Sequence, residues 1–117
     1  MRVLVAGSRD WCAAWMINAV LEALFRQVPI DCVISGEACG ADTLGASWAL
    51  SHGIEVMRFP ADWAKHGKRA GYLRNQQMLD EGLPGLVVVF NKGGSPGSTM
   101  MAELSRKSGV QTVEVRA

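Results

Sequence analysis

Residues 86–99 read LVVVFNKGGSPGST, and within this stretch the chain passes from a strand to a helix. The run Leu86-Val87-Val88-Val89-Phe90 is the most strongly β-like in the sequence, and it carries no polar residue, as in strands buried on both faces. A turn of glycine and hydroxyl residues follows. Ser95-Pro96 fits a helix N-cap followed by proline at the first helical position. The sequence predicts a strand over 86–90 and a helix over 96–107 that ends before Gly109.

The same transition occurs twice earlier in the chain. An apolar run at 3–6 meets the turn Gly7-Ser8-Arg9, and a second run at 30–35 meets a turn from Gly36 to Asp42. Apolar spacing predicts helices over 12–27, 41–52 and about 68–81, and further strands over 54–59 and 110–115. Strands that alternate with helices indicate an α/β protein with right-handed crossovers and a parallel sheet. Ligands of such sheets bind beyond the carboxyl ends of the strands, where we expect all three turns to converge on one crevice.

These turns have the composition of anion sites. Glycine allows a ligand to approach the backbone closely, and the free N–H groups of a helix N-terminus favour phosphate or carboxylate. Asp42 accepts hydrogen bonds from ribose hydroxyls or caps the helix that it begins, and Arg9 is a phosphate donor or a solvated arginine. The 93–99 turn is the best phosphate cradle, although it lacks the lysine of a P-loop, and no turn has the Gly-x-Gly-x-x-Gly spacing of dinucleotide sites. The ligand-binding residues predicted in the turns are Gly7, Ser8, Arg9, Gly36, Glu37, Gly40, Ala41, Asp42, Gly93, Gly94, Ser95, Gly97, Ser98 and Thr99.

One segment, residues 60–75, interrupts the regular alternation with four Lys or Arg residues against a single aspartate. It leaves the third strand at its carboxyl end, so it can reach over the same crevice. Arg74 holds a phosphate or carboxylate, or is a surface arginine, and Trp63 stacks on a base or packs in the core. Asp62, Trp63, Arg74 and Asn75 complete the predicted site.

The totals describe one domain spanning residues 1–117, with 49% hydrophobic residues and a net charge of +1. This near-neutral charge does not favour nucleic acid as a partner. The apolar run before Gly7 is too short for a signal peptide, and no run reaches the ~20 residues of a membrane span, so we expect a cytoplasmic protein. Three cysteines without a Cys-x-x-Cys pair, and two isolated histidines, predict no disulfide framework and no metal site. No cofactor is expected.

Some apolar residues have more than one reading. We assign Trp48, Cys32 and the methionine pairs to the core. Trp11 and Trp15 either cover the crevice or pack between subunits, and the second arrangement would give a homo-oligomer.

Three motifs resemble the SLOG superfamily, specifically its small YspA-like branch. They are Gly7-Ser8-Arg9-Asp10-Trp11; Ser35-Gly36 with Gly40-Ala41-Asp42-Thr43-Leu44 and Trp48-Ala49; and Phe59-Pro60-Ala61-Asp62-Trp63 with Gly67-Lys68, Ala70-Gly71, Arg74-Asn75 and Met78. Together with Gly94 and Gly97-Ser98-Thr99 they span nearly the whole chain. The resemblance implies a three-layer Rossmann-like fold with a mainly parallel five-stranded sheet, a nucleotide or nucleotide-derived ligand, and a bacterial or phage origin.

The chain departs from the LOG phosphoribohydrolases of this superfamily at one position. Those enzymes carry Pro-Gly-Gly-x-Gly-Thr-x-x-Glu, and the glutamate is catalytic. Here the corresponding position is Met101 or Ala102, and Glu103 misses it by one or two residues. Glu37 and Asp42 are the other carboxylates available.

The sequence therefore favours binding of a phosphorylated, nucleotide-derived small molecule by a sensor or sequestering protein over catalysis. The alternative is an N-glycoside hydrolase that acts on nucleotide 5′-monophosphates, as LOG enzymes do. A third possibility is single-stranded nucleic acid binding through residues 60–75, as in the DprA relatives, but the chain is poor in the aromatic residues on which bases stack.

Overall fold

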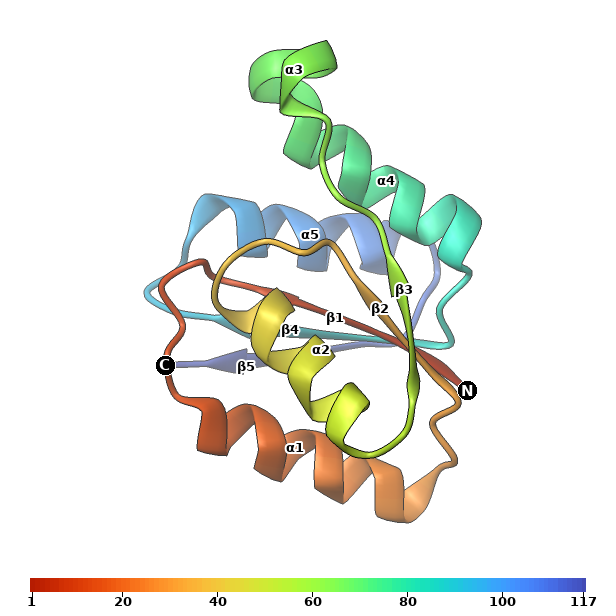
Figure 1. The fold of residues 1–117 in the computed structure, drawn as a ribbon. Helices are drawn as coiled ribbons and strands as arrows, with labels where there is room; N and C mark the ends of the chain where they lie inside the picture. The colour runs from red at the N-terminus through yellow and green to blue at the C-terminus, as the bar shows by residue number, and fades with distance from the viewer.

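The computed structural model describes all 117 residues. It has five strands and five α-helices, which alternate along the chain except where α3 and α4 follow one another (Figure 1). The strands are β1 (Arg2–Gly7), β2 (Cys32–Ser35), β3 (Glu55–Arg58), β4 (Leu86–Asn91) and β5 (Thr112–Arg116). The helices are α1 (Ala14–Gln27), α2 (Ala41–Ser51), α3 (Trp63–His66), α4 (Ala70–Gly82) and α5 (Pro96–Lys107), with a 3₁₀ turn at Gly67–Arg69.

All strand pairs are parallel and the strand order is β3-β2-β1-β4-β5. The chain starts in the middle of the sheet, builds outward to β3, and then crosses back to β4 on the other side of β1. The order reverses between β1 and β4, which is where ligands of open parallel sheets bind. The predicted α/β class and parallel five-stranded sheet are confirmed.

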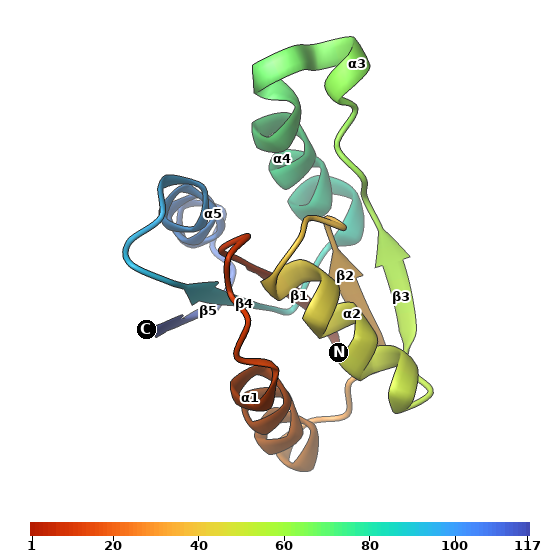
Figure 2. The same ribbon diagram turned by 60° about the vertical axis from the view of Figure 1, so that its left-hand side comes forward.

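Helices cover both faces of the sheet (Figure 2). Alternate residues of a strand point to opposite faces and therefore to different helical layers. Val3, Val5 and Phe90 pack with α1 and α2, whereas Leu4 and Val89 pack with α4 and α5. Because both faces are covered, β1 and β4 are buried along almost their whole length, which explains their uninterrupted apolar sequences.

The predicted element boundaries are close to those observed, with one real difference in the 60–75 segment. The helix predicted from about Lys68 begins at Ala70, and α3 with the 3₁₀ turn precedes it. Asp62 explains the extra helix, because its carboxylate accepts a hydrogen bond from the Lys65 N–H at 3.0 Å and caps α3. α3 projects beyond the rest of the molecule, above the carboxyl end of the sheet (Figure 1).

Burial corrects several assignments of apolar residues. Trp48 and Cys32 are buried as predicted, and Met101 is buried on α5. Met100, which we expected in the core, is 41% exposed, because it lies one residue earlier on α5 and is turned away from the sheet. Trp11 is buried with its ring edge against Phe90, and Trp15 is exposed on α1.

None of the helices combines the length and the apolar character that a membrane crossing requires.

Candidate functional site

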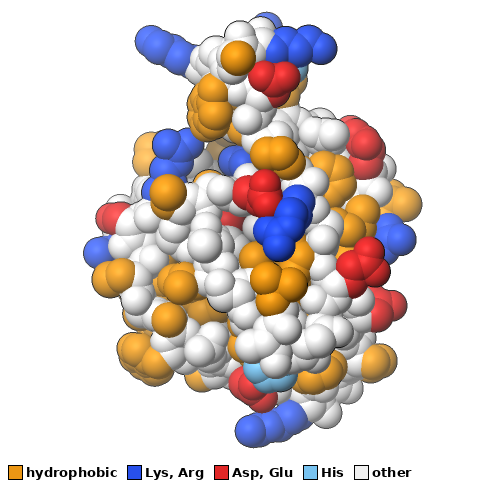
Figure 3. Space-filling view, in the orientation of Figure 1, with side chains coloured by type: hydrophobic (Ala, Val, Ile, Leu, Met, Phe, Trp, Pro, Cys, Tyr) orange, Lys and Arg blue, Asp and Glu red, His pale blue; other side chains and the backbone are white.

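A cavity of about 500 Å³ opens at the carboxyl ends of β1 and β4, between the start of α5 and the α4 helix. Its position is the one that the reversal of strand order predicts. In the space-filling view the surface is hollowed beneath the projecting α3 lobe, and Lys and Arg side chains gather there (Figure 3). The lining residues are Ala6, Gly7, Ser8, Arg9, Asp10, Ala38, Asp42, Lys68, Gly71, Tyr72, Arg74, Asn75, Ser95, Gly97, Ser98, Met100 and Met101.

A second cavity of about 320 Å³ adjoins the first, and Arg9, Ala38 and Arg74 line both. Its other lining residues are Gly36, Glu37, Cys39, Pro60, Ala61 and Trp63. The two cavities therefore share a wall that carries two guanidinium groups.

The structure brings residues from all three glycine turns and from the 60–75 segment to these cavities. The predicted site residues that line one or both are Gly7, Ser8, Arg9, Gly36, Glu37, Asp42, Trp63, Arg74, Asn75, Ser95, Gly97 and Ser98. Gly40, Ala41, Asp62, Gly93, Gly94 and Thr99 lie outside both walls. These six shape the turns or hydrogen-bond behind the cavity; Thr99, for example, accepts from Asn91 at 3.2 Å.

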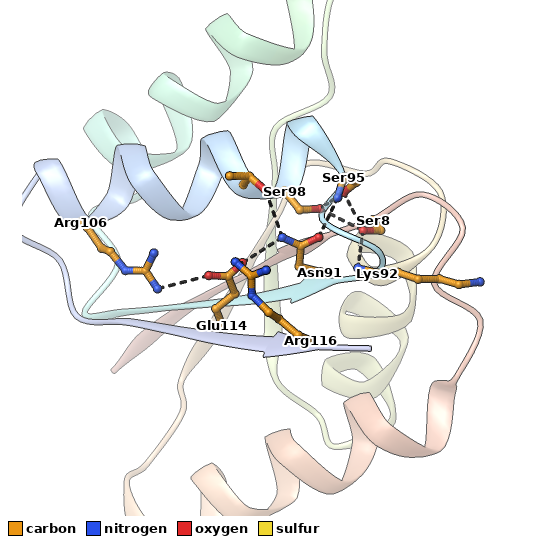
Figure 4. Close-up of polar contacts among 9 residues, drawn as sticks. Ser8, Asn91, Lys92, Ser95, Ser98, Arg106, Glu114 and Arg116 are labelled. Atoms are coloured by element: carbon orange, nitrogen blue, oxygen red, sulfur yellow. Dashed lines mark hydrogen bonds and ion pairs between the residues drawn. The ribbon is translucent and has the colours of Figure 1, made fainter.

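Three serine hydroxyls form a compact cluster where the β1 turn meets the N-terminus of α5 (Figure 4). Ser8 Oγ lies 2.8 Å from Ser95 Oγ and 3.1 Å from Ser98 Oγ, and Ser95 donates to Ser98 at 2.8 Å. The Lys92 backbone N–H donates to Ser8 Oγ at 2.9 Å. Each hydroxyl can rotate, so the cluster can redirect its protons to an anion in the cavity.

Asn91, the last residue of β4, holds this cluster in place from behind. Its Oδ1 accepts from the Ser95 N–H at 2.9 Å, and its Nδ2 donates to Glu114 Oε2 on β5 at 2.9 Å (Figure 4). Glu114 also pairs with Arg106 and Arg116. The Asn91 hydrogen bond is the main cause of the lowered pKa of Glu114. The turn is thus anchored to both β5 and α5.

Asp42 and Arg74 are two charged residues in the wall of the main cavity. Asp42 is only 3% exposed, and burial raises its pKa from 3.8 to about 6, against the opposing effect of Arg74 and of backbone N–H groups. Asp42 does not cap α2: the N-cap is Gly40, and no side-chain cap is made. Asp42 lines the main cavity, and its carboxylate lies against the backbone N–H groups of Ala38, Gly7 and Gly36.

Arg74 is held by neutral acceptors rather than by a carboxylate. It donates to the Gly36 carbonyl oxygen and to Asn75 Oδ1. Burial is the main cause of its lowered pKa. Gly36 is required here because a Cβ would lie 2.6 Å from an Arg74 nitrogen and 2.8 Å from Asp42 Oδ2.

Trp63 is 50% exposed, so the core packing that we considered for it is wrong. Its ring lies 5.4 Å from the guanidinium carbon of Arg9, within the range of a cation–π contact. The projecting α3 carries Trp63 away from the core and over the second cavity.

Several wall residues were not among the predicted site residues, including Lys68, Tyr72 and Met100. Lys68 and Tyr72 lie in the basic segment that we expected over the crevice, so a helical reading from 68 onward could have found them. Met100 carried no such signal.

The position of the LOG glutamate differs here in structure as well as in sequence. Met101 is buried and lines the main cavity, whereas Glu103 is exposed and lines neither cavity. The carboxylates in the walls are Asp10, Asp42 and Glu37, and Glu37 is paired with Arg58 at 2.8 Å.

The sequence profile described as "YspA, cpYpsA-related SLOG family" matches residues 1–66, more than half of the chain. The chain belongs to this SLOG family. The Gene 61 protein of Mycobacterium phage D29 is 32% identical over 120 aligned residues, which cover 96% of this chain and 94% of the relative. That alignment includes α4 and α5, which supply walls of the main cavity that the family profile does not reach. No solved structure matches the chain.

Proposed function

We propose that this SLOG protein binds a nucleotide-derived small molecule that carries a phosphate, and that it acts as a sensor or a sequestering protein. One observation carries the proposal. The serine cluster at the N-terminus of α5, the buried Asp42 and the neighbouring Arg74 line the same cavity, so an anion site and a hydroxyl acceptor face one ligand.

The phosphate site is the first turn of α5. Pro96 occupies the first helical position, which leaves the N–H groups of Gly97 and Ser98 at the cavity wall. The helix dipole and the free N–H groups favour an anion there. The hydroxyls of Ser8, Ser95 and Ser98 add donors that need only rotate.

The sugar site is Asp42. A carboxylate accepts two hydrogen bonds from a pair of neighbouring hydroxyls such as those of ribose. Arg74 keeps positive charge beside it without a direct ion pair, so Asp42 retains acceptor capacity toward the cavity.

We place the nucleobase of the ligand at the rim of the main cavity, between α4 and α5. Tyr72 and Met100 line the cavity and are 49% and 41% exposed. An aromatic ring and a thioether are suitable surfaces for a planar base.

Calorimetric titration with nucleoside 5′-monophosphates and with the matching nucleosides tests the proposal. We expect at least one monophosphate to bind, and its nucleoside to bind at least tenfold more weakly. We expect Ser98→Ala to weaken monophosphate binding about tenfold, the effect of losing a hydrogen bond to a charged group.

Ser105→Ala is the matched control. Ser105 is buried on the same helix, but its hydroxyl bonds to Ala102 O and Thr112 and does not line the cavity. Absence of heat for every monophosphate at millimolar concentration contradicts the proposal. Chromatography of the same mixtures reveals any released base, the result expected of a phosphoribohydrolase.

A further inference from the structure

The second cavity has the composition of a ligand subsite, although the proposed nucleotide site does not need it. Its volume of about 320 Å³ falls within the range of small-molecule pockets. It adjoins the main cavity at the shared residues Arg9, Ala38 and Arg74. We propose that it receives a second ring-bearing unit, so that the ligand consists of two such units joined by a diphosphate that Arg9 and Arg74 bind. This inference rests on the proposed function of the main cavity.

The shared wall is positively charged, although Asp42 beside Arg74 offsets part of that charge. Arg9 makes no ion pair, and Arg74 donates to a backbone carbonyl oxygen and to an amide oxygen rather than to a carboxylate. The neighbouring Arg9 charge contributes to the lowered pKa of Arg74. The nearby Glu37 is already paired with Arg58. Two guanidinium groups that make no salt bridge favour a doubly charged linker, because guanidinium groups bind phosphate oxygens in bidentate fashion.

Trp63 supplies the surface for the second ring. Its ring edge rests against α4, since a Cβ on Gly71 would lie 3.4 Å from the ring. The side chain nevertheless remains half-exposed and lines the second cavity. An exposed aromatic side chain is a surface on which a planar ring can stack.

The contact of Arg9 with Trp63 is compatible with this use. An exposed cation–π contact is weak. The Arg9 guanidinium lies 5.4 Å from the ring centroid, so it can turn toward a phosphate at small cost. Arg9 and Trp63 together would then bind the linker and the distal ring.

A ligand series separates the parts of this proposal. Calorimetry compares the nucleoside 5′-monophosphate that binds best, its 5′-diphosphate, and the symmetric dinucleoside 5′,5′-diphosphate of the same base. We expect the dinucleoside diphosphate to bind at least tenfold more tightly than the simple diphosphate. Trp63→Ala should remove this gain and leave the affinity for the monophosphate within twofold, whereas Trp63→Phe should keep most of the gain.

Trp15→Ala is the matched control, because Trp15 is an exposed tryptophan on α1 that lines neither cavity. It should change none of the affinities. If monophosphates bind but the dinucleoside diphosphate gains nothing, or gains as much in Trp63→Ala, this inference is overturned and the proposed function stands. If neither the mononucleotides nor the dinucleoside diphosphate binds, the proposed function fails and this inference fails with it.

Discussion

Burial disfavours the ionised form of Asp42, and this residue nevertheless lies in the wall of the main cavity. Ala41 beside it is fully buried, and Asp42 itself is 3% exposed. Three backbone N–H groups, those of Ala38, Gly7 and Gly36, lower its pKa but do not offset burial. Strained or costly groups are often concentrated at binding sites, and Asp42 fits that pattern.

The raised pKa of Asp42 predicts a specific pH dependence of stability. Its folded-state pKa of about 6 exceeds the ordinary value of 3.8, so the ionised group destabilises the fold above pH 6 and this penalty disappears as the pH falls toward 4. At roughly 1.4 kcal/mol per pKa unit, the full penalty is about 3 kcal/mol. Asp42→Asn removes the titration. The free energy of unfolding of the variant relative to wild type should therefore fall by about this amount between pH 7 and pH 4, measured by urea denaturation.

Asp80→Asn serves as the control for that experiment. Asp80 is exposed on α4 and accepts a hydrogen bond from Gln76. The same measurement on this variant shows how much of the change any Asp→Asn substitution causes. A difference from wild type that stays constant with pH for Asp42→Asn would contradict the assignment.

At the scale of elements, the site depends on a close approach between the β1 turn and the start of α2. Gly40 has a φ of +77°, and a Cβ there would lie 2.4 Å from the Ser8 carbonyl oxygen. The Ala41 N–H donates to that same oxygen at 3.3 Å. Glycine at position 40 therefore shapes the cavity from outside its wall, which is why it belongs to the motif without lining the site.

A second link between elements runs through Asn91, which joins β4 to β5 and to α5. Asn91→Ala leaves the part-buried Ser95 N–H without its acceptor and removes a donor from Glu114. We expect a loss of about 1–3 kcal/mol in the free energy of unfolding, the cost of a buried group left without a partner. The pKa of Glu114 should rise, because Asn91 is the main cause of its lowering.

Chemical denaturation and NMR titration of the Glu114 carboxyl measure these two effects. Asn18→Ala, at an exposed position on α1, is the comparison and should cost little. A loss of stability without any change in the Glu114 titration would show that Asn91 acts through packing alone.

At the scale of the whole molecule, the two helical layers share the central strands. The layer of α1 and α2 and the layer of α4 and α5 pack on alternate residues of β1 and β4. Both layers pack on the same strands, so unfolding of one layer would expose one face of the sheet that supports the other layer. We therefore propose that residues 1–117 form one cooperative unit.

Denaturation followed separately in each layer tests this proposal. Fluorescence of the buried Trp11 and Trp48 reports on the α1–α2 layer, and the NMR signals of the Met78 and Met101 methyl groups report on the other. The two midpoints should coincide, as expected for two-state unfolding. Distinct midpoints would show that the layers unfold independently.

The amino-acid sequence determined the alternation of elements and the position of the site at the carboxyl edge. Apolar runs such as Val3–Ala6 and Leu86–Phe90 are uninterrupted because both faces of these strands are buried, and such a run is visible in neighbouring residues alone. Ser95-Pro96 marked the start of α5 because the preference of proline for the first helical position is also local, although the Ser95 hydroxyl makes no capping hydrogen bond. The convergence of the turns followed from the general topology of parallel sheets.

Only the tertiary structure decided which residues face a ligand. Several features depend on how α3 and α4 pack above the sheet. They are the exposure of Met100 and Trp63, the donation of Arg74 to neutral acceptors rather than to a carboxylate, and the shared wall between two cavities. These contacts join residues dozens of positions apart, and small changes in helix orientation would alter them. Local sequence determines elements because neighbouring residues determine backbone conformation and burial pattern, whereas a binding surface is formed by side chains that meet only after the chain has folded.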